Sequence, residues 1–220
     1  MMDSSPLKLP VDDQRLIFQK LIDRFPFDLH HDTHPDFLPA YSQTQRSYHD
    51  IRHIDELLNI MQQYLIDTGQ QARQRWNLAD RLIKAIWIHD MVQDDSGESE
   101  AKSYELAATQ LRADWPKEAL SQLRKSVRPL VMATAHFSQP TDMSAAEQVM
   151  ADIDLTPLGV PYDEFMANSR KVRAEFEHVP DQVYAAARAN ILGIFLSRSR
   201  IYHTVWFYQR FETRARANLR

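Results

Sequence analysis

Cysteine is absent from the 220-residue chain, and only four glycines occur in it. Without cysteine, neither a disulfide nor a thiolate metal site can form, so any bound metal ion must have nitrogen and oxygen ligands. So few glycines argue against a sheet protein with many tight turns, because those turns need residues that adopt positive φ angles. The two shortages favour a helical protein in which a metal site would consist of histidine and carboxylate side chains.

Long apolar runs and a targeting segment are also missing. No apolar run approaches the ~20 residues that a helix needs to cross a bilayer. Residues 1–6 lack the basic region followed by an apolar one that marks a secretory signal. We therefore expect a cytoplasmic protein with no membrane segment.

An excess of positive charge is lacking as well. The chain has 26 Lys and Arg residues against 30 Asp and Glu, which gives a formal net charge of -4. General nucleic-acid binders and membrane-surface binders present a positive field, so we expect neither kind of partner. The chain is 44% apolar, enough for a substantial core, and its length suits a single domain over residues 1–220.

The spacing of the apolar residues predicts an all-α fold of about eight or nine helices. Apolar residues recur mostly every three or four positions, which is the period of a helix with one buried face. The proline-rich residues 26–47 should instead form a long loop. The expected helices cover residues 12–25, 48–68, 78–90, 98–112, 116–136 with a kink at Pro129, a segment that begins at the capping box Ser144 to Glu147 and carries Asp152 and Asp154, two segments that begin at Pro161 and Pro180, and residues 204–218.

Four residues from distant parts of the chain together predict a metal site, namely His53, the adjacent pair His89 and Asp90, and Asp154. Histidine and carboxylate ligands suit a divalent transition metal. The His89-Asp90 pair follows a short apolar run and is costly to bury without a partner; a metal ion would satisfy both side chains, and a self-satisfied core pair is the alternative. His49 lies four residues before His53, so on one helix both would point from the same face.

The same residues resemble the motifs of the HD-domain superfamily of metal-dependent phosphohydrolases, and within it a bacterial group described as predicted metal-dependent HD phosphohydrolases. The similarity spans about residues 46–219, with a motif core at about 46–159 and carboxyl-terminal helices at 161–219. Several matches occur in the expected order, which makes the resemblance specific. The segments that carry it are Arg46, Tyr48-His49-Asp50-Ile51-Arg52-His53-Ile54, Trp87-Ile88-His89-Asp90, Ser99-Glu100-Ala101-Lys102-Ser103, Asp152-Ile153-Asp154-Leu155-Thr156-Pro157-Leu158-Gly159, Val172-Arg173-Ala174-Glu175-Phe176 and Glu212-Thr213-Arg214-Ala215-Arg216-Ala217-Asn218-Leu219.

The resemblance implies a divalent ion (Mn, Fe, Ni, Co, Zn or Mg) held by His53, His89, Asp90 and Asp154. Its implied function is the cleavage of a phosphate ester or anhydride in a small metabolite or nucleotide by metal-activated water. His49 would donate a proton to the leaving oxygen. Three further residues have implied roles, each with an alternative. Arg46 would bind phosphate or form a surface salt bridge, and Glu100 would orient the attacking water or cap a helix. His136 would bind a second metal ion or the substrate, or pack in the core.

One aspartate of the Asp152-Asp154 pair should be turned away from this site. Residues two apart on a helix diverge by about 200°, so only one of them can face the ion. The Asp-Leu pattern of the resemblance points to Asp154, which leaves Asp152 to cap, to pair with an arginine or to support a ligand.

Gln93, Ser99 and Phe137 depart from the pattern of the group. They leave two other functions open: a non-catalytic module that binds metal and nucleotide, and a di-iron oxygenase on the same scaffold. The oxygenase would need more protein ligands than the four named above. Phe137, which follows His136 where a second histidine is common in the group, argues against such a larger set. The sequence predicts neither the substrate nor the oligomeric state.

Overall fold

The computed structural model describes residues 8–27, 36–69, 72–94, 97–137 and 142–220. Within these ranges the chain is all-α, which confirms the expected fold class, and no strand is present. Nine of the α-helices have ten or more residues. The elements are α1 (Val11–Arg24), α2 (Leu38–Tyr41), α3 (Ile51–Asp67), α4 (Ala72–Ile88), α5 (Ser99–Leu111), α6 (Lys117–Ser126), α7 (Arg128–Met132), α8 (Ala145–Asp154), the 3-10 helix η1 (Thr156–Gly159), α9 (Tyr162–Glu175), α10 (Asp181–Ser197) and α11 (Val205–Asn218).

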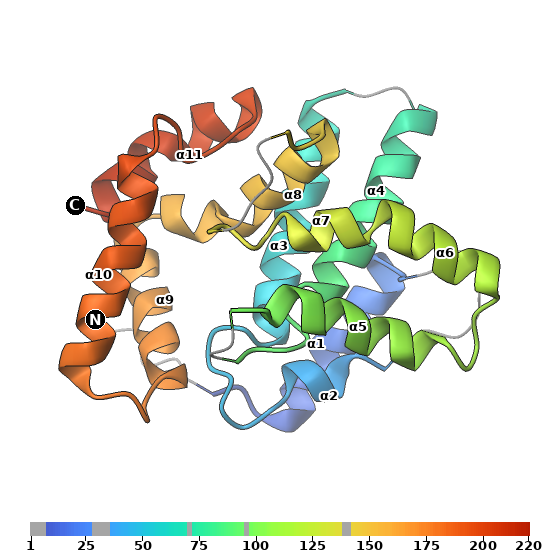
Figure 1. Cartoon of the computed structure of the whole chain (residues 1–220), viewed down its shortest axis with the longest axis horizontal. Helices are drawn as coiled ribbons and strands as arrows, with labels where there is room; N and C mark the ends of the chain where they lie inside the picture. The colour runs from blue at the N-terminus through green and yellow to red at the C-terminus, as the bar shows by residue number, and fades with distance from the viewer. Residues whose placement is uncertain (1–7, 28–35, 70–71, 95–96, 138–141) are drawn as a thin grey trace.

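Helices α3 and α4 form the centre of the molecule (Figure 1). They pack against each other, and α8 packs against both. Helices α9, α10 and α11 lie together at one end of the molecule, whereas α5 and α6 lie at the other (Figure 1). The central helices therefore lie between the two ends, and residues from distant parts of the sequence can converge there.

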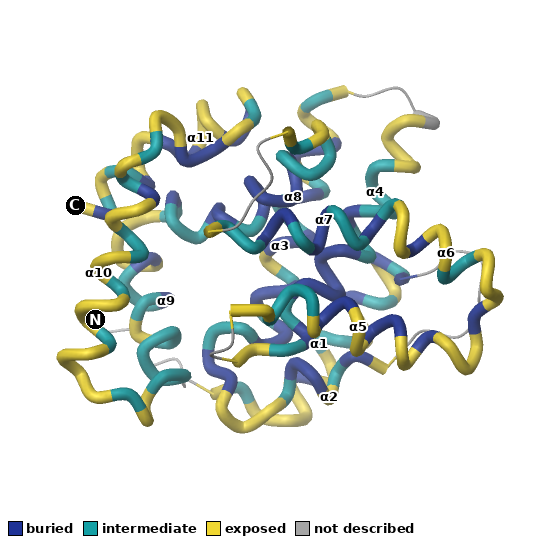
Figure 2. Tube along the Cα trace, viewed as in Figure 1, coloured by how far each residue is buried: buried dark blue, intermediate teal, exposed yellow. Residues whose placement is uncertain are grey.

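Helix α3 is the most deeply buried of the long helices (Figure 2). Its apolar residues recur at helical spacing, and the Asp50 side chain caps its amino terminus by accepting a hydrogen bond from the Arg52 N–H. Four of its side chains are wholly inaccessible to solvent, namely Ile51, Ile54, Leu57 and Leu58. A buried, capped helix gives the residues at its first turn a fixed position.

Three expected helices differ from those observed. The helix expected over residues 78–90 begins earlier, at Ala72, and ends at Ile88. The helix expected from residue 48 begins at Ile51, because Asp50 is its cap, and His49 therefore precedes the helix instead of sharing a face with His53. The kink expected at Pro129 is wrong: α6 ends at Ser126 and α7 begins at Arg128. A proline lacks the N–H that a continuous helix needs and is tolerated in the first turn, where Pro129 lies.

The proline-rich segment is also less simple than a loop, since it contains the one-turn helix α2; residues 28–35 lie outside the described part. The capping box expected at Ser144 and Glu147 is confirmed: the Ser144 hydroxyl accepts from the Glu147 N–H, and the Glu147 carboxylate accepts from the Ser144 N–H. Where a local rule governs an element, the sequence was sufficient to predict it.

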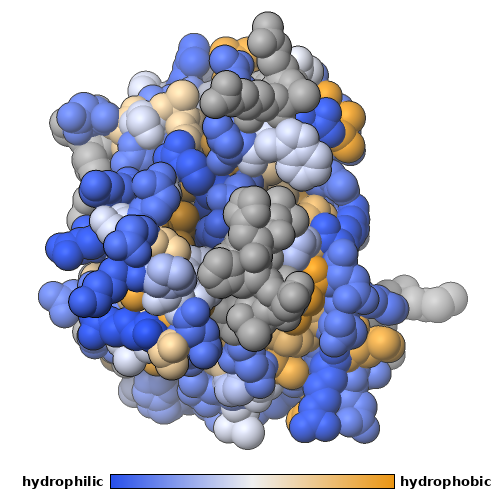
Figure 3. All heavy atoms as spheres, turned by 90° about the vertical axis from the view of Figure 1, so that its right-hand side faces the viewer, coloured by the Kyte–Doolittle hydropathy of each residue, from blue (hydrophilic) through white to orange (hydrophobic). Residues whose placement is uncertain are grey.

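The face shown in Figure 3 is mostly hydrophilic, with apolar side chains in small patches. Among the described residues, no helix has both the length and the apolar character that crossing a membrane requires.

Helix η1 packs closely on α11, and Gly159 makes this approach possible. A Cβ built at Gly159 would lie 2.7 Å from the Phe211 Cβ and 2.8 Å from the Phe211 carbonyl oxygen. The contact is reinforced by Asn218, whose amide donates to the carbonyls of Leu158 and Val160 at 2.8 and 2.9 Å. Because η1 directly follows α8, this contact fixes the end of the helix that carries Asp154.

Gly159→Ala should lower the free energy of unfolding by about 1–3 kcal/mol, since the added methyl group would push α11 away from η1. Gly193→Ala is the matched control. A Cβ at Gly193 meets nothing within 4 Å, and alanine is the better helix former by about 0.5–1 kcal/mol, so the control should be stabilised. Urea unfolding monitored by circular dichroism measures both; equal stabilities for the two variants would contradict the packing described.

Candidate metal centre

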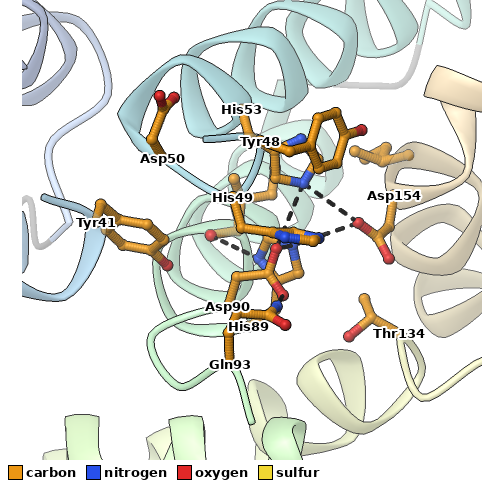
Figure 4. Close-up of polar contacts among 12 residues, drawn as sticks. Tyr41, Tyr48, His49, Asp50, His53, His89, Asp90, Gln93, Thr134 and Asp154 are labelled. Carbon is orange, nitrogen blue, oxygen red and sulfur yellow. Dashed lines mark hydrogen bonds and ion pairs between the residues drawn. The ribbon is translucent and has the colours of Figure 1, made fainter. Parts of the chain in front are cut away.

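Four side chains converge between α3, α4 and α8 (Figure 4). His53 lies in the first turn of α3, His89 and Asp90 directly follow α4, and Asp154 is the last residue of α8. One ligand atom from each of His53, His89 and Asp90 lies within 4.8 Å of the others, so the three could hold a metal ion. The structure thus brings together the residues that the sequence suggested as ligands.

Asp154 closes the group from the side opposite Asp90. Its Oδ1 lies 3.6 Å from His53 Nε2 and 3.4 Å from His89 Nε2. Asp90 Oδ2 lies 3.5 Å from His53 Nε2 and 3.0 Å from His89 Nε2. Ligands about 2.1 Å from a tetrahedrally coordinated ion are about 3.4 Å from one another, which is the spacing seen between these imidazole nitrogens and carboxylate oxygens.

Two buried ring nitrogens in the group lack a hydrogen bond within the described structure, namely His53 Nδ1 and His89 Nε2. The other ring nitrogen of His89, Nδ1, lies 2.9 Å from the Ile86 carbonyl oxygen. A carbonyl only accepts, so Nδ1 carries a proton. Nε2, which faces one oxygen of each carboxylate, is therefore the nitrogen that would bind an ion. A carbonyl holding the distal N–H is the usual partner of a metal-binding histidine.

The two carboxylates are held in their ionised form. Burial alone would raise the pKa of Asp90, but the charges of His89 and His49 hold it below its ordinary value. Burial likewise acts to raise the pKa of Asp154, but the hydrogen bond from His136 and the neighbouring rings of His53 and His89 outweigh it, so the pKa is well below the ordinary value. Two buried anions side by side require positive charge close by, and the residues present fit a divalent ion.

Asp152 is turned away from this group, as helical geometry predicts. It is fully buried, and its two oxygens accept from the backbone N–H groups of His203 and Thr204 at 2.7 Å each. Burial raises its pKa to about 7, against the effect of these hydrogen bonds. Asp152 therefore holds the two residues that precede α11, whereas Asp154 faces the histidines.

His49 is held beside the group by a residue to which the sequence analysis gave no role, Glu175. His49 Nδ1 lies 2.6 Å from Glu175 Oε2, and Glu175 Oε1 accepts from the N–H groups of Ser47, Tyr48 and His49 at 2.8 to 2.9 Å. Burial opposes ionisation of Glu175, but the hydrogen bond and charge of His49 lower its pKa to about 2. Glu175 lies in one of the segments that carry the family resemblance, but no local pattern indicated a partner 126 residues away.

The pKa of His49 is raised as a result. Burial acts to lower it, and the charge of Asp90 together with the hydrogen bond that His49 donates to Glu175 more than offsets that effect. Glu175 accepts the Nδ1–H and so leaves Nε2 as the nitrogen available for proton transfer. This is the arrangement of a proton donor oriented by a carboxylate.

The contacts of Arg46 match neither of its predicted roles, which were phosphate binding and a surface salt bridge. Only 4% of it is exposed, and its guanidinium donates to the carbonyls of His49, Asp90 and Met91 at 2.7 to 2.9 Å. Its donors thus join the segment before α3 to the segment after α4. This favours a role in positioning His49 and Asp90 over direct contact with phosphate.

Three other residues that the sequence analysis named, Gln93, His136 and Glu100, lie around the four ligand candidates. Gln93 donates to Asp90 Oδ1 at 2.6 Å, which orients that carboxylate. His136 Nε2 lies 2.8 Å from Asp154 Oδ2, on the oxygen not directed at His53 and His89. Glu100 lines the same pocket, and its pKa is raised by burial and by the charges of Asp90 and Asp154. The roles predicted for His136 and Glu100 remain predictions.

The group opens into a pocket with a volume of about 700 Å³, within the range of small-molecule sites. His49, His53, Asp90 and Asp154 lie on one of its walls, and residues of α9 and α10 form much of the rest. A ligand in the pocket would therefore contact both the candidate metal ligands and His49.

Comparisons of this chain with protein-family models, with curated protein sequences and with solved structures find no match. The description of the site accordingly depends on its own geometry and on the motif residues.

Asp154→Asn should weaken metal binding by tenfold or more, because it removes the charge of a residue that faces both imidazole nitrogens. Asp152→Asn is the matched control, since it makes the same change two residues away, on the face of α8 that contacts the residues before α11. It should lower the melting temperature and leave metal affinity nearly unchanged. Isothermal titration with Mn²⁺ and Zn²⁺ measures the affinities; the reverse ranking would show that α8 presents the other aspartate to the site.

Proposed function

We propose that this chain is a metal-dependent phosphohydrolase that cleaves a phosphate ester or anhydride of a small metabolite or nucleotide. The observation that carries the proposal is the arrangement of His53, His89, Asp90 and Asp154 on the wall of a pocket next to His49. Ligand candidates that lack a pocket would suit a structural metal site, whereas an open side is what catalysis requires. The resemblance to HD-domain phosphohydrolases supports the same reaction.

His53, His89, Asp90 and Asp154 would hold the ion, and the open side of the group faces the substrate. A divalent ion in this place supplies positive charge that polarises a phosphoryl oxygen and lowers the pKa of a water molecule toward neutrality. With a divalent ion bound, two carboxylates and two neutral imidazoles would make the site formally neutral. A neutral site binds an anionic substrate more readily than a site with excess negative charge would.

His49 is placed to supply the proton that the leaving oxygen needs. Its Nδ1–H donates to Glu175, so the imidazolium is stabilised and its second proton is on Nε2. Transfer of that proton breaks the Nε2–H bond and neutralises the leaving alkoxide as its bond to phosphorus breaks. Glu100 has a raised pKa and lines the same pocket, which suits the orientation of an attacking water.

The proposal is tested by measuring phosphate release from a panel of nucleotides, sugar phosphates and aryl phosphates. Purified protein is assayed after chelation and again with Mn²⁺, Fe²⁺, Co²⁺, Ni²⁺, Zn²⁺ or Mg²⁺. We expect release that depends on one or more of these ions and is lost in His89→Ala together with the metal. Binding of metal and nucleotide without turnover would instead identify a non-catalytic module, and oxygen consumption with Fe²⁺ would identify an oxygenase.

His49→Gln should reduce turnover by about 10²-fold or more while metal content stays at the wild-type level, because the residue is proposed to donate a proton and not to bind the ion. Glu175→Gln should reduce turnover less, since the Nδ1 partner is kept and only its charge is lost. His203→Gln, at an exposed histidine, is the control and should change neither quantity. Loss of metal from His49→Gln would reassign the residue to the ligands, and unchanged turnover would remove it from the mechanism.

A further inference from the structure

The two carboxyl-terminal helices that line the pocket offer both apolar and polar side chains. Helices α9 and α10 contribute the apolar side chains Phe165, Val172, Val183, Ala187, Ile191 and Phe195, together with the polar side chains Asn168, Ser169, Tyr184 and Arg188. The hydroxyl groups of a sugar placed against the apolar side chains would lose their hydrogen bonds to water without replacement. This part of the pocket therefore suits an apolar body more than a sugar.

Arg188 on α10 is the only lysine or arginine that lines the pocket within the described residues. It is half-buried, and the described structure gives it no hydrogen bond and no ion pair. Tyr48, His53, Asp90 and Asp154 line the same pocket. The guanidinium therefore shares a pocket with the candidate metal ligands, and its planar set of donors is unused.

Asn168 on α9 is a second unused polar group in the pocket. It is only 8% exposed, and its amide makes no hydrogen bond to any described residue. A buried amide without a partner is costly, so its donors and acceptor are expected to meet a ligand or water. Asn168 lies seven residues before the end of α9 (175 − 168 = 7) and Arg188 seven residues after the start of α10 (188 − 181 = 7), so both are equally far from the connection between the helices.

We propose that Arg188 and Asn168 bind the phosphoryl oxygens of a phosphate monoester whose body is apolar, and that the apolar side chains of α9 and α10 in the pocket bind that body. The hydrolysis of such a compound rests on the proposed function, whereas its binding does not. Arg46 cannot serve as the phosphate ligand because its guanidinium is engaged with backbone carbonyls. Arg188 takes that role with a bidentate geometry that matches two phosphoryl oxygens.

Phenylphosphonate and methylphosphonate are suitable probes, because their carbon–phosphorus bond cannot be hydrolysed and they differ only in the apolar body. Isothermal titration is carried out with the full chain, both chelated and loaded with Mn²⁺, and with glucose 6-phosphate as the polar comparison in chelated protein. We expect phenylphosphonate to bind at least tenfold more tightly than methylphosphonate or glucose 6-phosphate. No detectable phenylphosphonate binding, or no preference over the other two, would overturn the proposal.

The residues are tested with Arg188→Met and Asn168→Asp, and melting curves establish that each variant is folded. Arg188→Met should weaken phenylphosphonate binding about tenfold or more in both the chelated and the loaded protein. Asn168→Asp keeps the shape of the side chain and adds a charge that repels the phosphonate, so it should weaken binding as well. The control is Arg170→Met, the same change at an exposed arginine of α9 outside the pocket lining, and it should bind as wild type does.

The two proposals fail in different ways. Tight, Arg188-dependent binding of phenylphosphonate with no phosphate release from phenyl phosphate would overturn the proposed function and leave the binding site intact. Phosphate release together with wild-type phosphonate affinity in Arg188→Met would overturn the binding site and leave the proposed function intact.

Discussion

Two carboxylates buried beside two imidazoles determine much of this structure. Asp90 and Asp154 both stay ionised at the centre of a helical core, and His89 Nε2 lies 3.0 Å from an oxygen of Asp90 and 3.4 Å from an oxygen of Asp154. Such an arrangement is unfavourable unless a positive charge completes it. Protonation of an imidazole would give one charge, and a divalent ion would give two and satisfy all four ligand atoms together.

The ligand candidates come from chain segments that meet only in the folded state, and charged side chains fix these segments through backbone groups. Arg46 joins the carbonyls of His49, Asp90 and Met91. Glu175 accepts three successive N–H groups before α3, and Asp152 accepts two before α11. Hydrogen bonds to charged groups are among the stronger ones in proteins, so these residues hold the geometry that a catalytic site needs.

The sequence was most informative where a local rule determines the structure. Helical periodicity predicted that only one of Asp152 and Asp154 faces the site, and the Asp-Leu pattern of the resemblance pointed to Asp154. The capping preference of serine and glutamate located the start of α8. His49 was assigned to the wrong element because Asp50, a preferred cap, was not recognised as the boundary of α3. The roles of Arg46 and Glu175 depend on contacts between segments 44 to 128 residues apart, and no pattern within a single segment indicates such contacts.

The central claim is that a divalent ion occupies the space between these four side chains, and anomalous diffraction tests it most directly. Crystals grown with Mn²⁺ would be measured near the manganese absorption edge. The account predicts an anomalous peak in contact with Nε2 of His53 and His89 and with the carboxylates of Asp90 and Asp154, and no such peak in crystals of His89→Ala. Wild-type crystals without a peak at this position, or with manganese bound only elsewhere, would contradict it.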